Sequence, residues 1–471
     1  MGVGALVPVL ILVVTAAVIG VGGAGRSRFP AAGLAWLGTV VCILAGLRMW
    51  GHRLRSFGMV DSDAFSLFLS FIVLTALVLS IPVAKVALDR QQEQAPAFYT
   101  LALLSAAGML LLVSTRNLIL MFVALETMSV GVYVLTGWSR DRGSSVEASL
   151  KYFFYGVFAS SLFLYGIALF YGAAGSADLA KIEAALITRA SQAGVLPVVA
   201  LVLLLVGFAY KVAAVPFHMW SPDVYQGAPT VVTGFMAVAV KAAAFGALIR
   251  VTGSLLSLSD EWKVVLWLLA VLSMTVGNLI AIAQDNIKRL LAYSSVAHAG
   301  YVLVGLIAGG VAGRTAVLFY LVGYTFMTFG AFAVAITLGK SGEDNLSIRS
   351  WGGLGWKYPL TGFAMSVFML SLAGIPATAG FVGKFYLFSA AIDEGYIALV
   401  LIAVINSLVS VYYYLRVVMV LYMGSPVPDP GLHPSWNLRL PLLVSSLATL
   451  VLGLYPGPVI SLARRAALEL F

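Results

Sequence analysis

The 471-residue sequence contains little charge: Asp, Glu, Lys and Arg together make up 10% of it. Soluble globular domains typically carry about 25% charged residues. Hydrophobic residues make up 61% of the chain, and its mean hydropathy is +1.01. A chain with so few charges lacks the polar surface of a water-soluble globule. We therefore predict an integral membrane protein embedded in the lipid bilayer.

Cysteine is scarce as well, since Cys42 is the only one in the chain. A disulfide needs two cysteines, and an iron–sulfur cluster generally needs about four thiolates. The sequence also lacks a glycine-rich phosphate loop of the Walker or dinucleotide type and the zinc-binding HExxH pattern. We expect no cofactor and no metal on this chain, so any redox chemistry or nucleotide hydrolysis must take place on another chain.

The few charged residues are unbalanced, with 28 Lys and Arg against 19 Asp and Glu, a net charge of +9. The basic residues are dispersed over many loops without a concentrated patch, so we expect no nucleic-acid partner. Lys and Arg occur in nearly equal numbers in alternate loops. The positive-inside rule therefore does not give the orientation in the membrane.

Long apolar runs, in contrast, are abundant. Runs of about 20 residues, each long enough to cross roughly 30 Å of hydrocarbon, recur along the whole chain. We predict an all-α polytopic membrane protein with about 14 transmembrane helices. An even number of spans puts both termini on the same side of the membrane. The expected spans run from Val3 to Gly23, Ala31 to Trp50, Ala64 to Leu88, Phe98 to Ser114, Leu118 to Trp138, Ala148 to Gly172, Val195 to Ser221, Ala228 to Val251, Glu261 to Ala283, Leu290 to Gly309, Thr315 to Leu338, Tyr358 to Ala391, Tyr396 to Met423, and Leu438 to Ile460.

Two of these spans contain helix breakers near their centres. The span from Tyr358 to Ala391 has 34 residues, about 50 Å as an unbroken helix, which exceeds the hydrocarbon thickness. Gly374 and Pro376 supply a break, because glycine allows unusual dihedrals and proline lacks a backbone donor. Pro216 interrupts the seventh span in the same way.

The two interrupted spans are each fourth in a block of five. Because five is odd, the second block starts from the opposite face of the membrane, and the two blocks form an inverted repeat. Broken helices at matching positions indicate a transport site near the midplane, although proline kinks without function are an alternative. The expected domains are residues 1–95, an N-terminal three-helix segment; 96–255, the first five-helix repeat; 256–423, the second, inverted repeat; and 424–471, the C-terminal span.

Five charged residues lie inside apolar runs: Glu126, Lys151, Lys211, Lys241 and Lys384. A charge in hydrocarbon costs several kcal/mol unless it is paired or faces water, so such residues are candidates for function. One glutamate cannot neutralise four lysines, so some lysines must be hydrated or deprotonated for part of a cycle. For Lys151, an alternative is snorkelling to the interface with Glu147 as its i−4 partner.

Two histidines add groups that titrate near neutral pH. His218 stands beside the break at Pro216. His298 has Ser294 and Ser295 at helical spacings that predict contacts with its ring, and a satisfied core histidine is the alternative reading. Three hydroxyl residues at i, i+4 and i+8 on the eleventh span are expected to hold a file of water molecules: Tyr320, Tyr324 and Thr328.

Three stretches resemble a known family: residues 211–230 (KVAAVPFHMWSPDVYQGAPT), 285–300 (DNIKRLLAYSSVAHAG) and 374–384 (GIPATAGFVGK). They are similar to the signature stretches of the antiporter-like membrane subunits of respiratory complex I, a proton-translocating NADH:quinone oxidoreductase. The resemblance covers nearly the whole chain. In one departure, Gly131 follows Ser129 where the family usually carries a proline, which leaves the shape of that helix open.

The resemblance implies a proton channel made of two half-channels joined by a polar axis at mid-membrane. On that pattern Glu126 pairs with Lys151, or alternatively with Lys211. Lys211 is the central proton carrier. Lys241 links it to the second half, and Lys384 passes the proton to the outside.

The resemblance also implies where the chain works and with what. It predicts a bacterial plasma (inner) membrane location with both termini periplasmic. The expected partners are the other membrane subunits of complex I, including neighbouring antiporter-like subunits, while NADH, FMN, iron–sulfur clusters and quinone bind partner subunits. Two alternatives stay open: a subunit of a multisubunit sodium/proton antiporter, and a membrane scaffold that pumps nothing.

Overall fold

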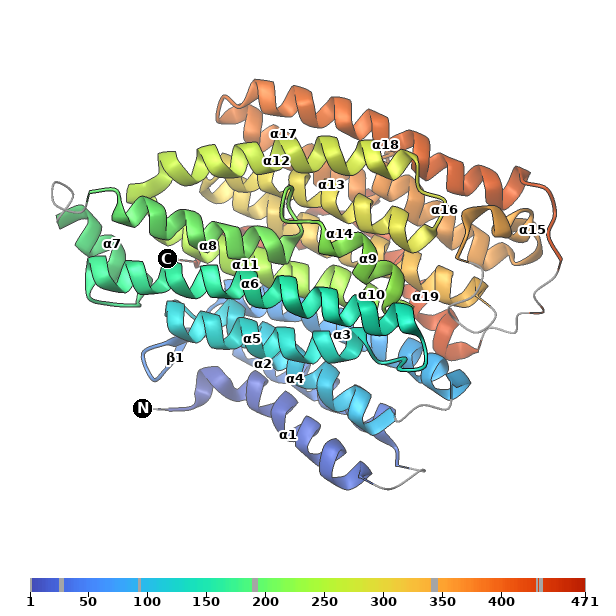
Figure 1. The fold of residues 1–471 in the computed structure, drawn as a ribbon, viewed down its shortest axis with the longest axis horizontal. Helices are drawn as coiled ribbons and strands as arrows, with labels where there is room; N and C mark the ends of the chain where they lie inside the picture. Colours follow the sequence, from blue (N-terminus) through green and yellow to red (C-terminus); the bar gives the residue numbers. More distant parts are fainter. Residues whose placement is uncertain are drawn as a thin grey trace.

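The computed structural model describes residues 2–24, 29–91, 95–188, 194–339, 346–428, 431 and 435–470. Long helices run side by side through the molecule, and both chain ends lie at the same end of the bundle (Figure 1). A two-stranded antiparallel sheet, β1 (Leu54–Ser56) with β2 (Val60–Ser62), joins the second and third helices and was not expected from the sequence. The all-α membrane architecture is confirmed.

The helical elements follow one another along the described chain. In the first half they are η1 (Gly4–Leu6), α1 (Val7–Gly23), α2 (Ala31–Met49), α3 (Ala64–Gln91), α4 (Ala95–Ser114), α5 (Leu118–Thr136), α6 (Gly143–Ala174), α7 (Leu179–Thr188), α8 (Leu196–Val212), α9 (Trp220–Gly227), α10 (Thr230–Phe235), the π-helical turn η2 (Met236–Val240) and α11 (Lys241–Ser254). In the second half they are η3 (Leu256–Leu258), α12 (Ser259–Ile282), α13 (Ile287–Ala308), α14 (Gly310–Leu338), η4 (Ile348–Trp351), α15 (Leu354–Lys357), α16 (Pro359–Ala373), α17 (Ala379–Asp393), α18 (Ile397–Met423), α19 (Trp436–Leu454) and α20 (Gly457–Leu468).

Within the described residues, twelve helices are long and apolar enough to cross a membrane. Two shorter apolar helices, α8 and α16, are the first halves of the two spans in which the sequence predicts a break. The chain leaves α8 at Ala213 and α16 at Gly374, each in the left-handed region with φ of 58° and 89°. The second halves are α9 and α17. The number of fourteen spans stays a prediction.

The last span corrects an expectation. The sequence predicted one helix from Leu438 to Ile460, but the structure ends α19 at Leu454 and starts α20 at Gly457. Pro456 lies between them and lacks the backbone N–H that a continuing helix would use. After this turn α20 packs against α3 and α14.

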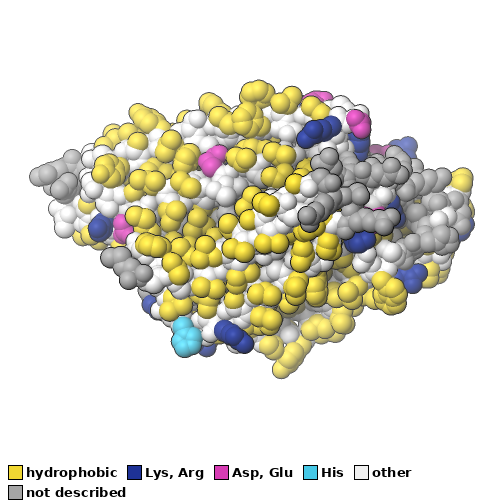
Figure 2. Space-filling model, turned by 90° about the horizontal axis from the view of Figure 1, so that it is seen from below, with side chains coloured by type: hydrophobic (Ala, Val, Ile, Leu, Met, Phe, Trp, Pro, Cys, Tyr) yellow, Lys and Arg dark blue, Asp and Glu magenta, His cyan; other side chains and the backbone are white. Residues whose placement is uncertain are grey.

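The best-buried part of the bundle lies in the middle of the chain. Nearly every residue of the segment Thr230–Ser254 and of helix α13 is buried, whereas α1, α2, α6 and α18 expose many large apolar side chains. Hydrophobic side chains cover most of the face seen in Figure 2. An apolar surface of this kind is what a bilayer solvates.

A buried ion pair fixes α11 to the start of α3. The Arg250 guanidinium donates to both carboxylate oxygens of Asp63, at 3.0 Å each, and to the carbonyl of Val113 at 2.9 Å. Both side chains are at least 95% buried. Removing one partner of such a pair typically costs about 3–5 kcal/mol. This contact holds the helix that begins with Lys241.

Candidate functional site: a polar file across the bundle

Lys211 lies in the last turn of α8, buried against α5. Its Nζ donates to Ser129 Oγ at 2.7 Å and to Tyr133 OH at 3.2 Å. The ammonium also lies 5.3–5.8 Å from the ring centres of Tyr133, Tyr152 and Tyr210, within cation–π range. Neutral hydroxyls and ring faces therefore surround the ammonium.

Glu126 lies on α5, one turn before Ser129. Its carboxylate accepts a hydrogen bond from Ser160 Oγ on α6. Within the part of the chain that the structure describes, Glu126 forms no ion pair. The direct pair expected with Lys151 or Lys211 is thus absent from this structure. Ser160 was missed because a serine in an apolar helix carries no distinguishing signal.

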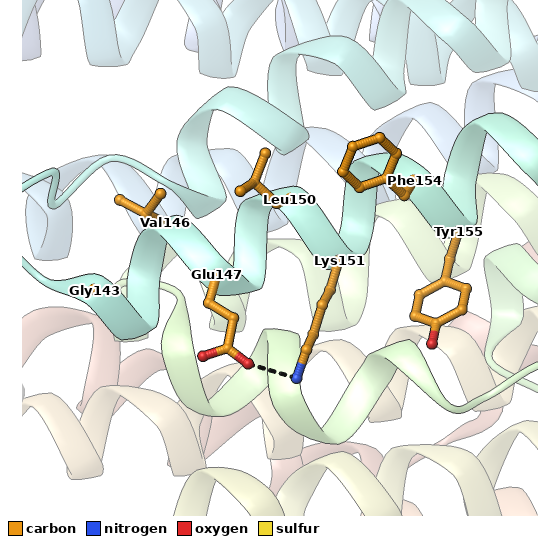
Figure 3. Close-up of a pocket in the computed structure, with 7 residues that line it drawn as sticks. All are labelled: Gly143, Val146, Glu147, Leu150, Lys151, Phe154 and Tyr155. Carbon is orange, nitrogen blue, oxygen red and sulfur yellow. Dashed lines mark ion pairs between the residues drawn. The ribbon is translucent and has the colours of Figure 1, made fainter.

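Lys151 forms ion pairs with two other carboxylates. Its Nζ lies 2.7 Å from Glu147, the i−4 partner considered from the sequence, and 2.7 Å from Asp223 on α9. Figure 3 shows Glu147 and Lys151 extending from the same face of α6 toward each other. Asp223 also pairs with Arg289 of α13 at 2.7 Å. Asp223 and Arg289 lie in the motif stretches and were not singled out as site residues.

Lys241 begins α11 directly after η2, and its side chain is buried. Its Nζ donates to both the carbonyl and the hydroxyl of Ser295 on α13. The ring of Tyr324 lies 5.7 Å from the ammonium, and Tyr225 OH lies 3.5 Å from Ser295 Oγ. Single π-helical turns frequently mark functional sites, because they shift the following side chain around the helix.

His298 is buried between two tyrosine hydroxyls. Its Nδ1 contacts Tyr320 OH, and its Nε2 lies 2.9 Å from Tyr414 OH. The sequence predicted that Ser294 and Ser295 orient the ring directly. Instead Ser294 Oγ hydrogen-bonds Tyr414 OH, so it acts on His298 through the tyrosine, while Ser295 holds Lys241.

Lys384 of α17 reaches back across the break of its own span. Its Nζ donates to the carbonyls of Leu372 and Ala373 at 3.0 Å each, and to Ser407 Oγ of α18 at 2.8 Å. The two carbonyls belong to the last turn of α16, the negative end of that helix dipole. The ammonium also lies 4.8 Å from the ring centre of Tyr301.

A polar network extends from this lysine into α12 and α18. Asn278 donates to Tyr301 OH at 3.1 Å and accepts from Tyr413 OH at 2.8 Å. It also donates to the carbonyl of Asn406 at 3.1 Å. None of these residues was singled out from the sequence, because an amide in a membrane helix is also compatible with simple helix packing.

The contacts together form a file of polar groups from Lys241 to Lys384. Lys241 contacts Ser295, and the neighbouring Ser294 contacts Tyr414. Tyr414 in turn contacts His298. The His298 ring lies 5.6 Å from the ring of Tyr301, which the Lys384 ammonium contacts. Two members of the predicted hydroxyl stripe line the same region. Tyr324 OH and Thr328 Oγ1 are buried without a well-formed hydrogen bond among the described residues. Buried polar atoms of this kind call for water.

His218 lies outside this file, in the segment between α8 and α9. It is half-buried, and its Nδ1 also lacks a well-formed partner within the described residues. Its ring lies 6.5 Å from that of Tyr293, five residues before His298 on α13. The structure therefore places it beside the file without joining it.

Comparisons with known proteins agree with this arrangement. A sequence profile of the NADH:quinone oxidoreductase/Mrp antiporter transmembrane family matches residues 115–410. The NADH-quinone oxidoreductase subunit N of Trichlorobacter lovleyi is 44% identical over 92% of this chain and 90% of its own length. The chain belongs to this family. The resemblance inferred from the three motif stretches is confirmed.

A further relative and two solved structures extend the comparison. The subunit N of Mycobacterium tuberculosis is 46% identical over 80% of this chain and 73% of its own length. A chain of respiratory complex I from Thermus thermophilus superposes with a TM-score of 0.81 at 38% identity, covering 97% of this chain and 98% of the other. A chain of the Mrp complex from a Dietzia species reaches a TM-score of 0.87 at 24% identity and shows the shared fold, covering 100% and 98%.

Proposed function

We propose that the chain is the antiporter-like subunit N of a bacterial NADH-quinone oxidoreductase and carries protons across the inner membrane. Support comes from the near full-length similarity to subunits N, combined with the buried polar file between Lys241 and Lys384. An apolar residue of similar size usually stabilises a buried position as well as a hydrogen-bonded lysine does. A structural role alone therefore does not explain a buried lysine. Three such lysines near the bundle centre support a transport role.

The proposed route begins at Lys211 and continues through Lys241 and His298 to Lys384. Each lysine holds a proton as an ammonium and passes it on when the neighbouring charge changes. The hydroxyl groups between them exchange donor and acceptor roles as the proton moves. Water at the unsatisfied Tyr324 and Thr328 hydroxyls completes the path between the first and second repeats.

Glu126 and Lys151 act around the entry to this route. Glu126 lies on the face of α5 that also carries Ser129, the residue that holds Lys211. Its carboxylate therefore stabilises the ammonium of Lys211 through space without a direct pair. Lys151 has a different role in this proposal: it fixes Asp223 of α9 between the two repeats. His218 marks the entry side of the break after α8.

The remaining parts of the proposal concern the whole complex. Both termini face the periplasm, residues 96–255 and 256–423 act as two inverted half-channels, and the other membrane subunits of the complex are the partners. This chain binds no flavin, iron–sulfur cluster or quinone, so partner subunits carry out NADH oxidation and quinone reduction. Proton movement here is driven by those reactions.

Purification through an affinity tag on this chain tests the assignment. We expect subunits with bound flavin and iron–sulfur clusters to copurify, together with NADH:quinone reductase activity. Recovery of membrane subunits alone, with sodium/proton exchange in vesicles and no flavin absorbance, would support the multisubunit antiporter instead. A scaffold predicts that replacing the buried lysines changes assembly and leaves proton pumping per turnover intact.

A further inference from the structure

An apolar cavity lies on the opposite side of α14 from the polar file's tyrosines, where α2, α3, α14 and α20 meet. Its volume is about 310 Å³, within the range of small ligand pockets. The lining is almost entirely apolar and includes Trp50, Phe71, Val322 and Leu462. An apolar cavity in contact with a bilayer is a site for hydrocarbon, because water there would find no hydrogen-bond partners.

The α3 residues that line the cavity, from Phe68 to Thr75, span about 10 Å along that helix. Trp50 follows the end of α2, at the level where tryptophans occupy the membrane–water interface. Thr75 lines the other end, eleven residues into α3, about 16 Å along the helix from its start at Ala64. The cavity therefore leads from the interface toward the midplane.

Two exposed arginines lie near the interfacial end of the cavity. Arg48 is exposed in the last turn of α2, next to the lining residue Leu47. Arg465 is exposed in the last turn of α20, about 9 Å along the helix from the lining residue Val459. Its Nε pairs with Glu469 at 3.2 Å, so Nη1 and Nη2 are the groups that face a phosphate in the proposal. A Cβ on Gly51 would lie 3.2 Å from Arg465 Nη2, so the ends of α2 and α20 meet here.

We propose that this cavity binds one acyl chain of an anionic phospholipid whose phosphate lies between Arg48 and Arg465. The bilayer supplies the ligand, the apolar lining accepts its tail, and the two guanidinium groups select a negative headgroup. Trp50 lies where the glycerol region of the lipid would be. The bound chain fills the junction between the N-terminal helices and α14, the helix that carries Tyr320 and Tyr324.

Reconstitution of the purified complex with brominated lipids tests the proposal. Complex is placed in nanodiscs of dibrominated phosphatidylglycerol or of phosphatidylcholine with the same chains, and electron microscopy maps locate the bromine. We expect bromine density in the cavity with phosphatidylglycerol. A cavity filled by a side chain of another subunit, or equal bromine density with both lipids, would overturn the proposal.

Substitutions test the binding of the lipid headgroup and of the lipid tail separately. The double variant Arg48→Gln, Arg465→Gln should lower the affinity for phosphatidylglycerol by roughly 25-fold, about five-fold per arginine, since one basic residue near the surface contributes ~1 kcal/mol. The matched control Arg439→Gln, an exposed arginine of α19, should leave it unchanged.

Thr75→Trp fills the inner end of the cavity and should remove the bromine density. Leu401→Trp, on the exposed face of α18, is its control. Unchanged phosphatidylglycerol binding in the double arginine variant would overturn the headgroup site, even if Thr75→Trp fails to assemble. Unchanged density in an assembled Thr75→Trp complex would overturn the tail site.

Discussion

The two broken spans bring an ammonium group to the same place by different means. In the first repeat, Lys211 lies two residues before the left-handed Ala213 that ends α8. In the second repeat Leu372 occupies the matching position, two residues before the left-handed Gly374. The ammonium there comes from Lys384 of the second half-helix and bonds the Leu372 carbonyl. Both repeats thus put a cation where a half-helix ends and its dipole is negative.

The partners of the two ammonium groups differ in a way that separates their roles. Two of the three partners of Lys384 are backbone carbonyls, which do not titrate, and the third is the Ser407 hydroxyl. Lys211 instead bonds two hydroxyl groups of α5, a helix that also carries Glu126. The carbonyl of the adjacent Tyr210 accepts a hydrogen bond from the Trp220 indole at 3.0 Å. We therefore expect the first site to respond to a nearby charge and the second site to be held mainly by the fold.

In the comparison of the two broken spans, the largest effect is expected for Lys211→Ala. The variant removes the carrier that joins the entry to the polar file, so proton pumping should fall about tenfold or more, a barrier increase of ~1.4 kcal/mol. Pumping is measured by dye quenching in proteoliposomes that contain the whole complex, with flavin content as the measure of assembly. Lys181→Ala, an exposed lysine of α7, is the control. Normal pumping by an assembled Lys211→Ala complex would contradict the route.

Lys384→Ala should also slow coupled turnover, by roughly three- to tenfold. The complex should assemble, because the Ser407 hydroxyl remains within 3.5 Å of the Ala373 carbonyl after the ammonium is lost. The rates of quinone reduction and proton pumping in the same membranes provide the measurement. If both rates equal those of the unmodified complex, Lys384 has no part in proton release.

Glu126→Gln tests whether the Lys211 site responds to a nearby charge, which is the expected difference from the Lys384 site. The substitution keeps the hydrogen bond with Ser160 but removes the negative charge near Lys211. Pumping should slow by several-fold while the flavin content stays constant, since an ammonium of this environment loses ~1 kcal/mol or more of stabilisation. Ser160→Ala should have a smaller effect. Equal pumping in Glu126→Gln and the unmodified complex would remove the distinction between the two sites.

The smallest effects come from single hydrogen bonds. Tyr133→Phe removes one of the two hydroxyls that hold Lys211, worth about 0.5–1.5 kcal/mol. Ser407→Ala removes one of three partners of Lys384, and the two carbonyls remain. Tyr133→Phe should therefore slow pumping more than Ser407→Ala. The reverse order would mean that the second site is the more responsive one.

The sequence predicted the features that depend on composition and on helix breakers. Low charge and long apolar runs indicate the membrane class, and the glycines and prolines around Pro216 and Gly374 mark both breaks. The buried lysines stand out because a charge in hydrocarbon is costly. These signals are local, so they can be read along the chain.

Features that depend on three-dimensional packing were missed or wrong. The π-helical turn before Lys241 contains no glycine or proline, so no residue within it indicates an irregular helix. The reach of Lys384 back to Leu372 depends on how α17 folds against α16. Lys151 pairs with Glu147, the i−4 alternative considered from the sequence, and also with Asp223, 72 residues away. Spacing along the chain could not distinguish Asp223 from Glu126 as the distant partner. The interruption at Pro456 was overlooked because the apolar run continues through it.

The most direct test of the central claim is the proton pumping of a complex that carries Lys241→Ala. Among the lysines that the structure describes, Lys241 is the one that bonds the α13 part of the polar file, through Ser295. The control Lys263→Ala changes a half-buried lysine near the start of α12, outside the polar file. Both complexes are assembled, checked for flavin and iron–sulfur clusters, and compared for protons moved per NADH oxidised and for turnover. The account predicts that the Lys241 variant loses coupled pumping while its control does not. A Lys241→Ala complex that moves protons at the unmodified rate and ratio would contradict a proton path through this chain of residues.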